Sequence, residues 1–191
     1  MNVDITLPDG SVRNYESPVT GYQIAESIGP RLLKDAICVE IDNKFQDLSY
    51  EISESINIRI VTTKDLDALH ILRHSSAHIL AQAVLNLYPN AQFGVGPSIE
   101  NGFYYDFLFE TPIKENELEN IEKEMKRIAK SAQSFIRSEI TKKDAKKIFK
   151  NQKLKLELIE SAESDEGVGE EIVSTYANDE FIDLCMGPHV P

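Results

Sequence analysis

The sequence predicts an α+β protein in two domains, residues 1–62 and 63–191. In the first sixty residues, short segments with alternating apolar residues, typical of strands, surround one short helical segment. A long helical period starts near residue 69, and a mixture of strand-like and helical segments follows it. The polar stretch Lys64–Asp67 joins the two parts.

The first domain begins with a predicted hairpin. Val3, Ile5 and Leu7 alternate with polar residues, and Asp9-Gly10 makes a tight turn before a return strand that starts at Val12. A short helix over residues 22–28 ends at Gly29-Pro30, and strands are predicted over 36–41 and 56–61 with a turn at Asp42-Asn43. This order predicts a small sheet with one helix across it.

The second domain combines two long helices with several strands. We expect helices over 69–87, which Pro89 ends, and over 118–132, and a short helix that starts at Thr141-x-x-Asp144. Further expectations are strands over 102–109, 135–140, 154–159 and 181–185, and a helix over 168–177.

Composition excludes several classes of protein. No apolar run approaches the roughly 18 residues of a membrane-spanning helix, and the first residues lack the basic and apolar regions of a secretory signal. Two cysteines are too few for a disulfide framework in a chain of 191 residues, so we expect a reducing, cytoplasmic location.

Charge is distributed unevenly along the chain. The net charge is −12, yet residues 123–155 hold twelve Lys or Arg against three acids, whereas residues 157–183 hold ten acids and no base. Screening over about 8 Å makes the local balance more relevant to binding than the sum. In one interpretation, both runs are solvated surfaces. In the other, the basic run forms a strip that binds phosphates, and the acidic run lies on the surface beside it.

Two pairs of chemically active residues share one spacing. His74 and His78 lie one helical turn apart, and Cys185 and His189 repeat the four-residue spacing beside a Gly-Pro break. Ligand chemistry alone favours a tetrahedral zinc site, while a catalytic cluster or separate local roles are the alternatives. His70 is expected to be a bystander at the helix start.

Other polar residues could join the same place. Asp183 shares a strand face with Cys185, and Lys155 alternates with leucines on the strand predicted over 154–159. Tyr104 and Tyr105 point to opposite faces of their strand, so one of them can line a given pocket. Gly96 permits a close backbone approach by a ligand or serves turn geometry. Cys38 alternates within an apolar strand and is expected in the core.

At these residues the sequence resembles a known family. The motifs Arg73-His-Ser-Ser-Ala-His78, Gly96-Pro-Ser-Ile-Glu-Asn-Gly-Phe-Tyr-Tyr-Asp106 and Asp183-Leu-Cys-Met-Gly-Pro-His-Val-Pro191 are similar to the amino-terminal editing domain of bacterial threonyl-tRNA synthetase. The opening Ile5-Thr-Leu-Pro-Asp-Gly-Ser11 resembles its TGS domain, a β-grasp unit. The resemblance covers essentially the whole chain. It implies a TGS-like domain over 1–62 and a two-layer α+β editing domain over 63–191.

The resemblance implies hydrolysis of serine wrongly esterified to threonine tRNA. His74 and Lys155 would position or deprotonate water. His78, Cys185, Asp183 and His189 would shape the pocket and bind the seryl group or terminal adenosine, while Tyr105 and the Gly96 backbone would contact the tRNA end. The expected partner is the aminoacylated 3′ end of tRNA, with no membrane contact, and a monomer is expected. The aminoacylation core, with its ATP site and catalytic zinc, would lie beyond this sequence.

Three alternatives remain open. Related alanyl-type editing domains hold zinc at a similar His/His/Cys/His set, so zinc at His74, His78, Cys185 and His189 is the less favoured reading, and no cofactor is expected for editing. A TGS-containing module that binds RNA or nucleotides, with no hydrolysis, is the second alternative. A domain stabilised by structural zinc is the third.

Overall fold

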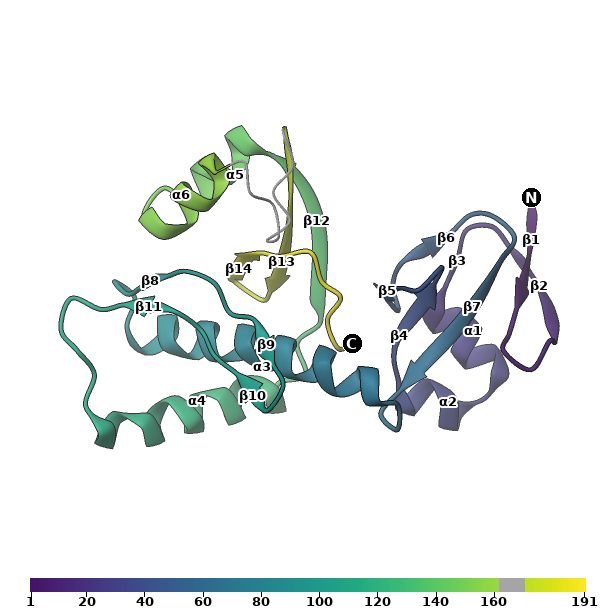
Figure 1. The fold of residues 1–191 in the computed structure, drawn as a ribbon, viewed down its shortest axis with the longest axis horizontal. Coiled ribbons are helices and arrows are strands. Elements are labelled where there is room, and N and C mark those ends of the chain that lie inside the picture. Colours follow the sequence, from purple (N-terminus) through teal and green to yellow (C-terminus); the bar gives the residue numbers. More distant parts are fainter. Residues whose placement is uncertain (162–170) are drawn as a thin grey trace. The chain divides into compact units, whose positions relative to one another are not determined.

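The computed structural model describes residues 1–161 and 171–191. These divide into two compact units: Met1–Leu72 with Gly187–Pro191, and Arg73–Met186. Figure 1 shows the elements of each unit along the chain. In the described residues, no helix is both long and apolar enough to cross a membrane.

The first unit is built on a five-stranded mixed sheet with the order β2-β1-β7-β4-β5. Its strands are β1 (Asn2–Thr6), β2 (Val12–Glu16), β4 (Ala36–Ile41), β5 (Lys44–Asp47) and β7 (Ile56–Thr62). β1 and β7 are parallel, and the other neighbours are antiparallel. The short strands β3 (Val19–Thr20) and β6 (Glu51–Ile52) form a separate pair. The predicted hairpin and the strands over 36–41 and 56–61 are therefore confirmed.

Two helices follow β3 in this unit. In α1 (Gly21–Ile28), the Thr20 side chain accepts from the Gln23 amide and Gln23 bonds back, which caps the helix start. Pro30 is the first residue of α2 (Pro30–Asp35), a helix that was not predicted from the sequence. Ile24 packs in one core with Val3 and Ile5 of the sheet, so α1 covers a sheet face as predicted.

The predicted turn at Asp42-Asn43 is confirmed. Both residues have positive φ, 49° and 60°, as the two-residue turn between β4 and β5 requires. Cys38 of β4 is fully buried, as predicted, and burial raises the pKa of its thiol to about 12. It is therefore an unreactive core residue.

Two long helices form one layer of the second unit. The helix α3 (Leu66–Leu87) begins within the first unit and continues into the second. It packs beside α4 (Leu118–Lys130), because Ala83 and Val84 share a core with Ile121 and Ile128 (Figure 1). A 3₁₀ turn, η1 (Glu115–Glu117), precedes α4. Both long helices match the sequence prediction to within a turn.

A three-stranded antiparallel sheet, with the order β12-β13-β14, forms the other layer. Its strands are β12 (Phe135–Thr141), β13 (Ile172–Asn178) and β14 (Phe181–Leu184). Thr141 caps α5 (Lys142–Ile148) by accepting from the Asp144 amide, which confirms the predicted helix start. Two minor pairs, β8 (Gln92–Phe93) with β11 (Phe107–Leu108) and β9 (Ser98–Ile99) with β10 (Gly102–Phe103), complete the unit.

Two predictions of secondary structure were wrong. The predicted strand over 154–159 is instead the helix α6 (Lys153–Glu160). Leu, Lys and Glu fill most of its positions, and their helix propensity prevails over the short alternation. The predicted helix over 168–177 is instead strand β13 from Ile172, whose β-branched and aromatic residues favour a strand. Residues 168–170 of that prediction, and residues 162–170 of the acidic run, lie outside the described residues.

The predicted strand over 102–109 is broken into two. Only β10 and β11 are regular, and residues 104–106 run between them. Asp106 still bonds the Gly94 and Val95 backbone across the break. The break does not change which side chain faces inward: Tyr105 is buried and Tyr104 is exposed, as the opposite-face argument predicts.

Candidate functional site

The histidine pair of α3 projects from one face of the helix. The rings of His74 and His78 lie 4.9 Å apart at an interplanar angle of 72°. His74 is half-buried, whereas His78 is 3% exposed. The more accessible ring is therefore the one that a substrate could meet.

Cys185 reaches the same place from the end of β14. Its Sγ lies 3.0 Å from Nε2 of His74. The ligand atoms of His74, His78 and Cys185 all lie within 4.8 Å of one another. We call these three residues the His/Cys cluster.

Ser174 of β13 fixes the position of Cys185. The Cys185 amide donates to the Ser174 carbonyl (3.1 Å), and the Ser174 hydroxyl donates to the Cys185 carbonyl (2.6 Å). The backbone bond continues the β13–β14 ladder by one residue past the strand, and the hydroxyl bond adds a side-chain contact to it. This role of Ser174 was not predicted, because a serine in a strand carries no sequence pattern that marks it.

Asp183 links the cluster to a second set of buried groups. Its Oδ2 lies 3.3 Å from Nδ1 of His78 and accepts from the Tyr105 hydroxyl at 2.5 Å. Its Oδ1 lies 2.5 Å from Nζ of Lys155, and both charged side chains are 1% exposed. A buried carboxylate with an ammonium and a hydroxyl donor satisfies the condition under which charges are tolerated in a protein interior.

Lys155 is enclosed by its partners. Besides the ion pair with Asp183, its ammonium donates to the Tyr105 hydroxyl at 3.1 Å and lies 4.8 Å from the centre of the Phe93 ring. The expected strand position of Lys155 was wrong, because this residue extends from helix α6. Its ammonium reaches Asp183 and Tyr105 from that helix. Lys153, two residues earlier, is exposed, since residues two apart on a helix face different directions.

Burial keeps His78 neutral. Desolvation, with smaller contributions from the neighbouring His74 and Lys155 charges, holds the pKa of His78 well below its usual range. A neutral imidazole offers one acceptor nitrogen and one donor nitrogen, so His78 can accept or donate a hydrogen bond without bringing charge into the core.

Gly96 lies beneath the Tyr105 ring. A Cβ placed on Gly96 would overlap the Tyr105 ring atoms Cδ2 and Cε2. The absence of a side chain therefore lets the Tyr105 ring pack where its hydroxyl reaches Asp183.

His189 lies in the segment Gly187–Pro191, which groups with the first unit. Its side chain is buried and its backbone amide donates to Oδ1 of Asp47 at 2.9 Å. That His189 joins the His/Cys cluster stays a prediction. His70 is exposed on α3, in keeping with its expected position at the helix start.

The donor atoms of the His/Cys cluster could hold a metal ion. Two imidazoles and one thiol within 4.8 Å are a nitrogen and sulfur set of the kind that zinc prefers. The same set, without metal, is an acid–base cluster with a potential nucleophile. The arrangement therefore suits two chemistries, which an experiment can separate.

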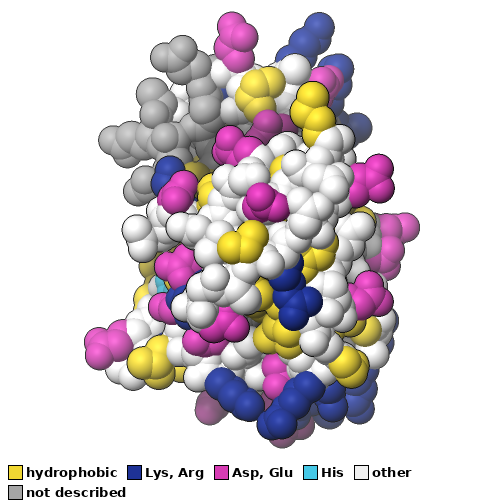
Figure 2. Space-filling view, turned by 90° about the vertical axis from the view of Figure 1, so that its right-hand side faces the viewer, with side chains coloured by type: hydrophobic (Ala, Val, Ile, Leu, Met, Phe, Trp, Pro, Cys, Tyr) yellow, Lys and Arg dark blue, Asp and Glu magenta, His cyan; other side chains and the backbone are white. Residues whose placement is uncertain are grey.

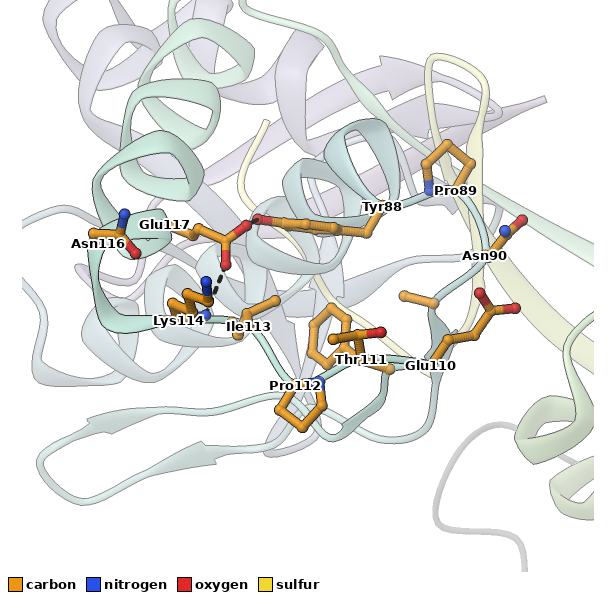
Figure 3. A pocket seen from close by; sticks show the side chains of 12 residues that line it. Tyr88, Pro89, Asn90, Glu110, Thr111, Pro112, Ile113, Lys114, Asn116 and Glu117 are labelled. Atoms are coloured by element: carbon orange, nitrogen blue, oxygen red, sulfur yellow. Dashed lines mark hydrogen bonds between the residues drawn. The ribbon is translucent and has the colours of Figure 1, made fainter.

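A pocket of about 580 Å³ opens elsewhere in the second unit (Figure 3). It lies between the end of α3 and η1, and none of the site residues predicted from the sequence lines it. The Tyr88 hydroxyl points to Glu117 and donates to its Oε1 at 3.1 Å, while the Lys114 amide donates to its Oε2 at 2.7 Å. These bonds lower the pKa of Glu117 and tie the loop to α3.

Comparison with known proteins defines the class of the first domain. The TGS domain family matches residues 3–62, which contain the five-stranded sheet and helix α1. Residues 3–62 thus form a TGS domain, in agreement with the resemblance of the opening motif.

The whole chain is similar to the amino-terminal region of threonine–tRNA ligases. It is 47% identical over 191 residues to the enzyme of Francisella philomiragia, 44% over 191 residues to that of Ralstonia nicotianae and 47% over 192 residues to that of Burkholderia multivorans. Each match covers 99% of this chain and 29% of the relative. The chain thus spans less than a third of the length of these curated relatives.

Proposed function

We propose that the second unit hydrolyses the ester that joins serine to threonine tRNA. The observation that carries the proposal is the His/Cys cluster, in which His74 and Cys185 lie 3.0 Å apart. It occurs in a chain similar throughout to threonine–tRNA ligases. An imidazole that can take a proton from water is a group that hydrolysis of an activated ester needs, and the thiol beside it can hold that ring in place.

Selection between serine and threonine explains why such a reaction is needed. The two amino acids differ by one methyl group, which supplies only about 1–3 kcal/mol of discrimination in a single pocket. A second site that excludes the methyl group can remove serine and spare threonine. The proposed reaction would thus proofread the product of the ligation step.

His74 is the proposed general base. As a half-buried imidazole it is the member of the cluster that a bound ester can approach. It takes a proton from water as the water oxygen bonds the ester carbonyl carbon. The bond from that carbon to the tRNA 3′ oxygen then breaks, and the proton passes to this oxygen, which leaves free serine and a 3′ hydroxyl. Cys185 orients the His74 ring.

The remaining predicted residues are proposed to shape the pocket. Neutral His78 and the tail residue His189 would bind the seryl group or the terminal adenosine. Lys155 acts as a hydrogen-bond donor that holds Asp183 and Tyr105, because its ammonium already donates to both. Of the two roles that the resemblance implies for Lys155, to position water or to deprotonate it, we propose only a positioning role.

Zinc binding at the cluster is the second candidate. The sulfur and nitrogen donors of His74, His78 and Cys185 fit a zinc ion, with His189 as the proposed fourth ligand. A bound zinc ion would supply a Lewis acid and lower the pKa of a bound water. Metal content measured on protein prepared without chelators, in wild type and Cys185→Ala, decides between the two.

The proposed partner is the aminoacylated 3′ end of tRNA, and the basic run offers phosphate contacts. Within it, Lys146 and Lys147 of α5 pair with Glu160 and Asp144, so part of its charge is neutralised locally. On the face drawn in Figure 2, acidic side chains are scattered and do not form one patch.

Charge reversal within Lys142–Lys150 separates editing from an RNA-binding module. An editing enzyme whose basic residues serve docking loses RNA binding in this variant and keeps hydrolysis of a seryl-adenosine analogue. A chain that binds RNA but deacylates neither substrate is a binding module. The direct test of the proposal compares deacylation of serine-charged and threonine-charged tRNA.

A further inference from the structure

Two glutamines bind each other's backbone segments where strand β8 meets the start of helix α6. Gln92 donates from Nε2 to the Asn151 carbonyl (2.9 Å) and accepts at Oε1 from the Lys153 amide (2.6 Å). Gln92 thus binds the backbone of the residues on both sides of Gln152. We call this arrangement, with the reciprocal contacts of Gln152, the glutamine clasp.

Gln152 makes the matching contacts in the opposite direction. Its Nε2 donates to the Ala91 carbonyl (3.2 Å), and its Oε1 accepts from the Phe93 amide (3.2 Å). Gln152 thus binds the backbone of the residues on both sides of Gln92. Four hydrogen bonds therefore join the two segments, and each glutamine both donates and accepts.

The clasp supplies what the start of α6 lacks. Gln152 is the N-cap residue of this helix, yet its side chain makes no capping bond to the helix. Gln92 instead accepts from the amide of Lys153, the first helical residue, and so caps α6 from another segment. A helix of eight residues is not stable alone, so its position depends on such contacts.

The position of α6 decides where Lys155 lies. Lys155 is in the first turn of this helix, directly after the clasped residues. The strand residue next to Gln92 is Phe93, whose ring centre lies 4.8 Å from the Lys155 ammonium. The clasp thus fixes both the helix that carries the ammonium and the ring that it covers.

We propose that Gln92 and Gln152 are positioning residues of the candidate site. They hold the first turn of α6 in the register that places Lys155 on Asp183 and Tyr105. The inference deepens the proposed hydrolysis and rests on it for its effect on catalysis. Its structural half, the placement of Lys155, can be tested without activity.

The test measures hydrogen exchange at the Lys155 ammonium by NMR on protein with ¹⁵N-labelled lysine. In the wild type, burial and ion pairing protect this group. In Gln92→Ala/Gln152→Ala we expect exchange about tenfold faster, since the first turn of α6 opens more often. Gln92→Glu, which keeps the acceptor for the Lys153 amide, should lie between the two.

Gln133→Ala is the matched control. Gln133 is a glutamine of the same unit whose side chain bonds Gln82 and Asp179. It should leave Lys155 exchange at the wild-type rate. If the double variant does not fold, the single alanine variants, which each remove two of the four bonds, give the same comparison. Exchange in the clasp variants equal to that of Gln133→Ala overturns the proposal.

Activity provides a separate readout. With serine-charged threonine tRNA, we expect the clasp variants to lower kcat about tenfold and to leave KM nearly unchanged, because Lys155 holds groups around the reacting ester. If the wild type does not deacylate this tRNA, the proposed function fails while ammonium exchange still decides the clasp. Faster exchange with unchanged kcat overturns the link between the clasp and catalysis.

Discussion

Nζ of Lys155 lies 2.5 Å from Oδ1 of Asp183, and each side chain is 1% exposed. An ion pair this deeply buried depends on both members, because either charge alone would be left in a medium that solvates it poorly. The pair also connects helix α6 to strand β14, and Lys155 and Asp183 lie 28 positions apart in the sequence. The stability of the second unit and the position of these site residues therefore depend on the same contact.

Loss of one member of this pair should be costly. We expect Lys155→Met to lower the free energy of unfolding by about 3–5 kcal/mol, since it strands the Asp183 carboxylate. Lys155→Met/Asp183→Asn should recover part of this loss, because no charge remains unpaired. Urea unfolding of the two variants and of Asp183→Asn measures the coupling. Additive effects of the two single changes would show that the pair is not coupled.

The lowered pKa of His78 predicts that the free energy of unfolding depends on pH. Its pKa is depressed in the folded protein, while an unfolded histidine has a pKa of about 6.5. Below about pH 6.5 the unfolded chain therefore binds a proton that the folded chain does not. Protonation of His78 therefore does not affect the free energy of unfolding above about pH 6.5. Below that pH the free energy of unfolding decreases as the pH falls, with a limiting slope of about 1.4 kcal/mol per pH unit.

The measurement is urea unfolding between pH 7 and pH 5, compared with His78→Gln. The variant should show a shallower loss of stability over this range, because the group that resists protonation is gone. His70→Gln, at an exposed position of the same helix, is the control and should follow the wild type. Parallel curves for wild type and His78→Gln would contradict the assignment.

Gly96→Ala should destabilise the second unit by about 1–3 kcal/mol, the usual cost of overpacking. The added Cβ would overlap the Tyr105 ring. Gly102→Ala is the matched control, since a Cβ there meets nothing within 4 Å. Thermal unfolding of both variants tests the difference. Equal melting temperatures would mean that the Tyr105 ring moves aside at little cost.

Metal content separates the two chemistries of the His/Cys cluster. We expect protein purified without chelators to hold no stoichiometric zinc, and EDTA to leave both the melting temperature and deacylation unchanged. Inductively coupled plasma mass spectrometry measures the content. A stoichiometric zinc ion that Cys185→Ala removes would contradict metal-free hydrolysis and favour the zinc-dependent alternative.

Much of the fold could be predicted from local pattern. The hairpin, α1, α3 and α4 follow from periodicity and from turn residues such as Asp42-Asn43, whose conformation the structure confirms. Residues 154–159 and 172–177 were misassigned because both stretches are short, so their apolar pattern indicates less about their structure than the helix and strand propensities of their residues do. The second helix α2 was missed because Gly29-Pro30 indicates both an end and a beginning.

The site was partly predictable for a different reason. His74 and His78 are one turn apart on a helix, so their proximity follows from spacing alone. That Cys185 joins them depends on the tertiary fold, and the shared spacing of the two motifs only suggested it. The roles of Ser174, Gln92 and Phe93 were not predictable, because they act through backbone bonds and ring contacts that have no sequence signature.

The proposed hydrolysis of a seryl ester depends on His74 as the general base. The most direct measurement is single-turnover deacylation of serine-charged and threonine-charged threonine tRNA by the wild type, His74→Ala and His70→Ala. We predict that the wild type and His70→Ala release serine faster than threonine. In His74→Ala, release of serine should fall by about 10²–10⁴-fold, the usual contribution of a general base. Equal rates in His74→Ala and His70→Ala, or equal release of the two amino acids by the wild type, would contradict the proposed selective hydrolysis by His74.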